Sequence, residues 1–266
     1  MLTVHRQELA PLERRAAPLP QLPSFASLLA AAEEEQLRGI GFFARAKRRD
    51  AKAVARRNAE ATAQRLLAEA QQAQAAGQAR LDATWARLLE NDEDAVLPVL
   101  EAAFRDNEAP VAAVGADGPV VSIAVLVPAE DVLPVRAPAV TAAGNVSLRV
   151  ATKGQSAEWY RQLVAGHVLV SVRETLATAP GATAVTVVAV RHTAAGFEPV
   201  LAARFDREKL ACAPLATKDA WAIVEQESLE LRVRQKGAAK ALQPLDLTSE
   251  PELQTLLHAF DVEESG

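Results

Sequence analysis

Residues 44–89 read ARAKRRDAKAVARRNAEATAQRLLAEAQQAQAAGQARLDATWARLL. Alanine, glutamine, glutamate, arginine and leucine dominate this segment, and these residues lose the least conformational freedom on entering a helix. The wider stretch from Glu33 to Leu89 contains no proline. It therefore predicts one long helix or a pair of helices, around which the rest of the chain has to be arranged.

A heptad spacing of four and three residues appears in the second half of this stretch. We call it the seam, and its residues are Ala59, Ala63, Leu66, Ala70, Ala73 and Gly77, followed after a jump of four by Leu81, Trp85 and Leu88. Small seam residues let two helices approach closely but bury little apolar area. The jump of four is a stutter, which locally unwinds a supercoil. The seam predicts a helical hairpin or an oligomerising coil; the alternative is a solvated alanine-rich helix without a fixed partner.

Basic residues gather in the first part of the same helix. On one helix face, at about 100° per residue, lies the basic stripe: Arg45, Arg48, Arg49, Lys52 and Arg56. Such a stripe can neutralise the phosphates of nucleic acid or an anionic membrane surface. It can equally be a solvated face, or pair with the acidic runs Glu33–Glu35 and Glu90–Asp94. No aromatic residue is interleaved with it, so base stacking is not indicated.

A second basic cluster around Gly237 offers another candidate contact for an anion or a nucleic acid; its residues are Arg232, Arg234, Lys236 and Lys240. Its alternative is a solvated hairpin edge, where basic side chains discourage further strand pairing.

Two glycines and two phenylalanines stand just before the long helix, in the run Gly39-Ile40-Gly41-Phe42-Phe43. The spacing predicts a hinge. Exposed, the run would be a partner site; buried, it would anchor the arm to the globular part. We expect the buried arrangement.

Composition excludes several classes of protein. The chain has 266 residues, a formal net charge of −5 and a single cysteine, Cys212, so no internal disulfide or thiolate cage can form. The four histidines are never at metal-ligand spacing. We expect no signal peptide and no membrane-spanning segment, because no apolar run reaches about 20 residues. The expected location is the cytoplasm.

The pattern divides the chain into three regions: a flexible arm at 1–23, a helical or coiled-coil region at 24–107, and an α+β domain at 108–266. In the first two regions we expect a helix from Ser24 to Leu37 and a further helix that ends at Arg105 and is capped by Asp92 or Asp94. Alternating apolar residues in the third region predict a hairpin around Asp117-Gly118.

Further elements are expected at Val146–Val150 (a third strand), 156–178 (a helix beginning at Ser156), Val185–Val190 and Glu198–Phe205 (strands), and Glu252–Phe260 (a short helix). Residues 219–225 and 228–234 fit strands, or a helix and a strand. The fold class is therefore α+β: a long helical arm followed by a sheet of four to six strands with a helix packed on it.

No catalytic motif is present. The chain lacks phosphate-binding glycine loops, the His-Glu-x-x-His zinc motif and the Gly-x-Ser-x-Gly elbow, and we expect no cofactor and no metal. Strand, helix and strand around Asp206, Glu208 and Lys209 suggest a restriction-endonuclease-like core, which uses acids and a lysine to hold Mg²⁺. Arg207 replaces one required acid, and Val185–Val190 carries none, so the alternative is a capped helix start.

One part of the chain resembles known proteins. The segment Leu81–Ala109, with Trp85-Ala86-Arg87-Leu88-Leu89 followed by Val96 to Phe104, is similar to a segment of uncharacterised actinobacterial proteins, and His167–Arg191 continues the match. Those proteins join an Ala/Arg-rich coiled coil to an α+β domain. The resemblance covers about half of the chain and implies an architecture, not an activity.

Three hypotheses follow for the function. The first is a non-enzymatic interaction or scaffold protein that forms homo-oligomers, or binds another protein, through the helical arm. The second is a nucleic-acid-associated protein that uses the basic stripe. The third is a degenerate nuclease-like domain.

Overall fold

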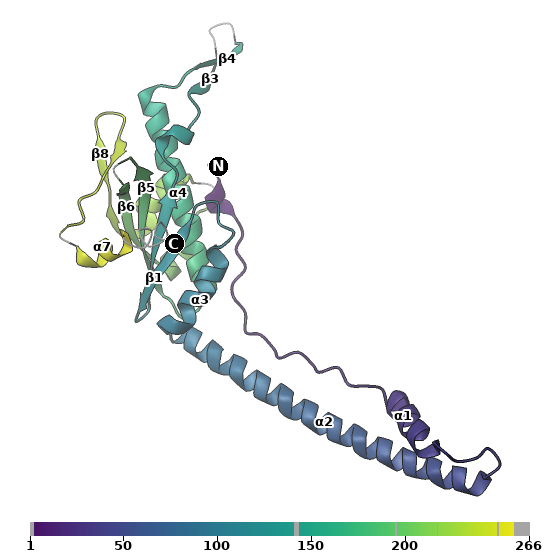
Figure 1. Cartoon of the computed structure of the whole chain (residues 1–266). Coiled ribbons are helices and arrows are strands. Elements are labelled where there is room, and N and C mark those ends of the chain that lie inside the picture. The colour runs from purple at the N-terminus through teal and green to yellow at the C-terminus, as the bar shows by residue number, and fades with distance from the viewer. Residues whose placement is uncertain (1–2, 141–143, 195, 217, 249, 258–266) are drawn as a thin grey trace. The chain divides into compact units, whose positions relative to one another are not determined.

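The computed structural model describes residues 3–140, 144–194, 196–216, 218–248 and 250–257. The chain divides into two compact units, a helical arm formed by Arg14–Trp85 and a globular unit formed by Met1–Glu13 with Ala86–Gly266. The predicted α+β class is confirmed, because a long N-terminal helix is followed by a sheet-plus-helix domain (Figure 1).

Two helices form the arm. Helix α1 spans Phe25–Leu37, and the Ser24 side chain caps it by accepting a hydrogen bond from the backbone N–H of Ser27. Helix α2 spans Arg45–Leu89, so its last residues belong to the globular unit. The turn between the helices contains Gly39 at a φ of +83°, a left-handed conformation that favours glycine.

The segment before α1 has no helix or strand between residues 14 and 24, and it lies beside α2 in the antiparallel direction (Figure 1). The backbone N–H of Ala17 donates to Oε1 of Gln78 over 2.9 Å. Nε of Arg14 donates to Asp82 over 2.9 Å, and this contact lowers the pKa of the Asp82 carboxyl.

A five-stranded sheet is the centre of the globular unit. Its order is β1 (Val111–Asp117), β2 (Val120–Val127), β5 (Ala184–Thr193), β6 (Gly196–Asp206) and β7 (Ser228–Arg232). Neighbouring strands are antiparallel except β2 and β5, which are parallel. The connection between those two carries helix α4 (Lys153–Thr178).

Each face of the sheet has its own cover. Helix α4 packs against β2 and β5 on one face, whereas α7 (Pro251–Leu257) contacts β2, β5 and β6 on the other (Figure 1). On the α7 side, Ala124, Val188 and Ala202 form a buried cluster with Leu247 and Leu256. Their strand neighbours point the other way and fill the core beneath α4.

The remaining elements lie around this core. They are η1 (Val4–Arg6), α3 (Glu93–Phe104), η2 (Glu130–Val132), β3 (Arg136–Val140), β4 (Val146–Val150), α5 (Arg207–Ala211), α6 (Ala220–Glu227), β8 (Arg234–Lys236) and β9 (Ala241–Gln243). Helix α3 is capped by Asp92, one of the two candidate caps, and packs on β1, so it belongs to the globular unit. The open choice at 219–234 is settled as a helix followed by a strand.

The predicted helix start at Ser156 is wrong, whereas the predicted strand at Val146–Val150 is confirmed as β4. Helix α4 begins at Lys153 instead of Ser156, because Thr152 and Gln155 form a capping box three residues apart. Strand β4 exists but does not join the main sheet; it pairs with β3 in a separate hairpin. Since directly paired residues share a face, one face of this hairpin exposes Val140, Val146, Leu148 and Val150.

The N-terminus also differs from the expected flexible arm. The turn η1 packs on α4, and His5 within it is 1% exposed. Arg173 donates to the backbone carbonyl of His5 over 2.6 Å, and the N–H of Leu12 donates to the carbonyl of Ala177. Burial lowers the pKa of His5, and that of His167 on α4.

Candidate functional site

The seam lies on the face of α2 that the N-terminal segment follows. A Cβ placed on Gly77 would lie 3.6 Å from Cβ of Ala17, so the extended segment runs directly over the seam there. Ala59 is buried and Ala63, Leu66 and Ala70 are half-buried, whereas Ala73 is exposed. The structure thus brings the predicted seam residues onto one face, and the chain's own N-terminal segment fills part of that face.

The C-terminal end of the seam lies in the globular unit. Leu81 and Trp85 are half-buried, but Leu88 is buried and belongs to the globular unit. Leu88 therefore stabilises the globular core and is not available for a partner helix.

The cover over the seam is thin. Within the helical arm, all of which the structure describes, the only apolar side chains that are fully buried are those of Ala55 and Ala59. Helix α1 has no buried residue at all. Meanwhile Leu19, Leu22, Phe25 and Leu67 remain exposed. The arm of one chain has no hydrophobic core of its own.

Ion pairs neutralise the distal part of the basic stripe. Nζ of Lys52 lies 3.5 Å from the Glu33 carboxylate on α1, and Arg56 pairs with Glu60 over 3.0 Å. Arg48 donates to the backbone carbonyl of Ile40. Within the described residues, the side chains of Arg45 and Arg49 make no ion pair or hydrogen bond. The unneutralised charge of the stripe is therefore at the start of α2.

The second basic cluster is not one continuous surface. Arg232 at the end of β7 forms an ion pair with Glu250 over 2.7 Å. Arg234 and Lys236 are exposed on β8, which pairs with β9 in a short hairpin. Lys240 in the turn after β8 is also exposed, and within the described residues Arg234, Lys236 and Lys240 form no ion pair.

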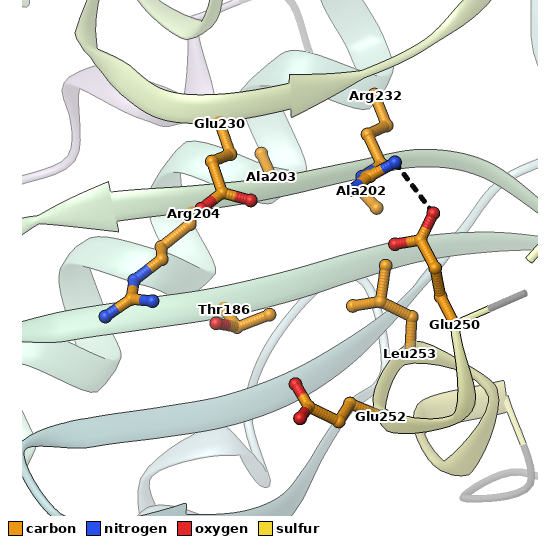
Figure 2. Close-up of a pocket in the computed structure, with 9 residues that line it drawn as sticks. All are labelled: Thr186, Ala202, Ala203, Arg204, Glu230, Arg232, Glu250, Glu252 and Leu253. Carbon is orange, nitrogen blue, oxygen red and sulfur yellow. Dashed lines mark ion pairs between the residues drawn. The ribbon is translucent and has the colours of Figure 1, made fainter.

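Arg232 and Glu250 line a pocket of about 220 Å³ on the α7 face of the sheet (Figure 2). Its other polar side chains come from elements distant in sequence: Thr186, Arg204, Glu230 and Glu252. Figure 2 shows the Arg204 guanidinium at the far end of the pocket from the Arg232–Glu250 pair. Nε of Arg204 is buried and, among the described residues, has no hydrogen-bond partner.

Sequence reasoning missed this pocket, because its residues meet only when β5, β6, β7 and α7 are assembled. It combines two arginines with three glutamates, and neither histidine nor cysteine lines it. No cluster in the described part of the chain has three His, Cys, Asp or Glu side chains placed to hold a metal ion.

The candidate nuclease residues have structural roles. The Asp206 side chain caps α5 by accepting from the backbone N–H of Lys209 over 3.0 Å. Lys209 in turn donates Nζ to the carbonyls of Gln226 and Ser228. Arg207 donates to the carbonyls of Ala179 and Ala182, which ties the turn after α4 to the end of β6.

Phe42 and Phe43 do not anchor the arm, so the expectation of burial is wrong. Their side chains are 81% and 93% exposed, and their rings form an edge-to-face pair with centroids 5.7 Å apart. The turn around Gly39 and Gly41 is open, since a Cβ added at either glycine would meet no atom within 4 Å.

Comparison with protein-family models, curated proteins and solved structures finds no match to this chain. The resemblance of 81–109 and 167–191 to actinobacterial proteins stays a prediction. Among the described helices, none combines the length and apolar character needed to cross a bilayer.

Proposed function

We propose that this chain is a non-enzymatic interaction protein that self-associates through its helical arm. One observation carries the proposal: the arm, Arg14–Trp85, fully buries only two alanine side chains within a single chain. Helices in proteins are stabilised mainly by packing an apolar face, because propensity alone is marginal. A second arm placed on the seam supplies that packing.

The seam suits a helical partner because its residues are small. Alanine and glycine at Ala63, Ala70 and Gly77 allow a close approach of two backbones, and Leu66 and Leu67 add apolar area. Leu67 and Ala73 are exposed. In the proposed assembly the N-terminal segment stays over Gly77, and the second arm packs on the uncovered part of the seam and on Leu67.

The test compares two triple variants of identical composition. Ala63→Glu/Ala70→Glu/Ala73→Glu places charge on the seam, whereas Ala61→Glu/Ala68→Glu/Ala75→Glu places it on the opposite, exposed face. Sedimentation equilibrium should show a defined oligomer for the unmodified chain and the control. The dissociation constant of the seam variant should be at least about 100-fold higher, because three charges must lose their hydration on association.

Circular dichroism of both variants checks that the arm stays helical. A chain that is monomeric at about 100 μM, or two variants that associate equally well, would contradict self-association through the seam.

The cytoplasm stays the predicted location, since Cys212 is exposed and the chain has no second cysteine for an internal disulfide.

Nucleic-acid binding is the second candidate, supported by the exposed and unpaired Arg45 and Arg49. A contact with about 6 phosphates should weaken roughly a thousandfold between about 50 and 200 mM salt. Titration of labelled duplex and single-stranded DNA measures this slope. Arg45→Glu/Arg49→Glu should abolish binding while Arg65→Glu/Arg80→Glu, with the same change in net charge, should reduce it much less. Absence of binding even at low salt would remove this candidate.

A further inference from the structure

The turn between α1 and α2 ends in an exposed aromatic pair. We call residues 39–44 the aromatic tip; Phe42 and Phe43 within it are the two most exposed large apolar side chains in the described part of the chain. Among the described residues, the one aromatic ring contact of Phe42 and Phe43 is with each other. Two adjacent phenyl rings exposed to solvent indicate a surface that a binding partner covers when the protein functions.

Cationic side chains surround the aromatic tip. Residues 36–49 contain no aspartate or glutamate but include Arg38, Arg45, Lys47, Arg48 and Arg49. Arg38, Arg45, Lys47 and Arg49 are exposed and form no ion pair within the described residues. On α2, Lys47 projects about 200° around the helix from Arg45, so the positive charge lies on several sides of the tip instead of one.

This distribution of positive charge around the aromatic tip fits a flat anionic surface better than it fits a nucleic acid. A strand or duplex is contacted side-on, by a groove or a stripe along the helix. Along the basic stripe, however, Lys52 and Arg56 are already paired with Glu33 and Glu60. The unpaired positive charge lies at the end of the arm, around the two phenyl rings. Apolar rings of this kind can insert at the interface of a lipid bilayer.

We propose that the aromatic tip binds the surface of an anionic lipid bilayer. Phe42 and Phe43 insert at the boundary between headgroups and acyl chains, while Arg38, Arg45, Lys47 and Arg49 contact the anionic headgroups. Insertion of a short apolar element and electrostatic attraction are each weak alone, and stable attachment needs both. The proposal does not depend on self-association through the seam.

The experiment is co-sedimentation of the full chain with phosphatidylcholine vesicles, with and without about 30% phosphatidylserine. Vesicles containing phosphatidylserine should bind the chain, and binding should fall with rising salt. Phe42→Ser/Phe43→Ser should lower the partition coefficient by on the order of 100-fold. Arg45→Gln/Arg49→Gln should lower it by about 25-fold, roughly fivefold per cation.

Val146→Ser/Leu148→Ser is the matched control, because it removes two exposed apolar side chains from the β3–β4 hairpin instead of the tip. It should bind like the unmodified chain. The proposal is overturned by failure to bind anionic vesicles, by unchanged binding of Phe42→Ser/Phe43→Ser, or by a larger loss in the hairpin control. Binding of DNA but not of vesicles, lost with Arg45→Gln/Arg49→Gln, would assign the tip to nucleic acid instead.

Discussion

Replacement of Gly181 by alanine is expected to lower the free energy of unfolding of the globular unit by about 3 kcal/mol. Gly181 lies in the turn after α4, where a Cβ would stand 2.6 Å from the carbonyl oxygen of Leu88 and closer still to that of Leu89. Both obstacles are backbone atoms at the end of α2, so no flexible side chain can move aside. The turn or the helix end must shift, and the packing between them is lost.

Urea unfolding followed by tryptophan fluorescence measures this effect, because one of the three tryptophans, Trp221, is buried in the globular unit. The control is Gly154→Ala in the first turn of α4, where the nearest atom to the new Cβ is 4.0 Å away. That change should be neutral or stabilise by about 0.5 to 1 kcal/mol, because alanine restricts the unfolded chain. Equal stability of the two variants would show that the turn does not lie against the end of α2.

Phe205→Ala should lower the free energy of unfolding of the globular unit by about 3 to 5 kcal/mol, because removal of a buried ring leaves a cavity that the core fills only in part. Phe205 is 0% exposed on β6, between Val185 of β5 and Ser228 of β7. It is among the largest fully buried side chains of the described core. The same urea titration measures the loss, and the midpoint should fall with little change in slope.

The conservative variant Phe205→Leu keeps most of the buried volume and should cost about 1 kcal/mol. If Phe205→Ala lowers the free energy of unfolding by no more than Phe205→Leu does, the position is not in a close-packed core. Neither substitution changes the helical arm, so assembly through the seam should persist in both variants.

Elements with a strong local pattern were predictable. Ser24 and Asp92 cap α1 and α3 as expected, because a capping oxygen acts on residues two or three positions away. The β1–β2 hairpin turns at Gly118, whose φ of 52° suits glycine. The long helix followed from its composition. A nearly continuous apolar run predicted β5, and the turn residues Ala195-Gly196 after it predicted β6 as the partner strand.

The candidate site was predicted less completely. The spacing placed Ala59, Ala63 and Ala70 on one face of α2, but it could not show that the N-terminal segment lies over that face. It likewise located the cations of the basic stripe without showing that Glu33 pairs with Lys52. These contacts join residues far apart in the chain, and periodicity along one helix contains no information about its neighbours.

Helix and strand formation depends on neighbours within a few residues, so the sequence alone was sufficient for the α+β class, the long helix and the caps of α1 and α3. Exposure and pairing depend on which surfaces meet after folding. The tertiary structure therefore had to show that Phe42 and Phe43 face solvent, that β4 pairs outside the main sheet, and that His5 is buried on α4. The physical reason is that burial is a property of the assembled surface, whereas propensity is a property of the local chain.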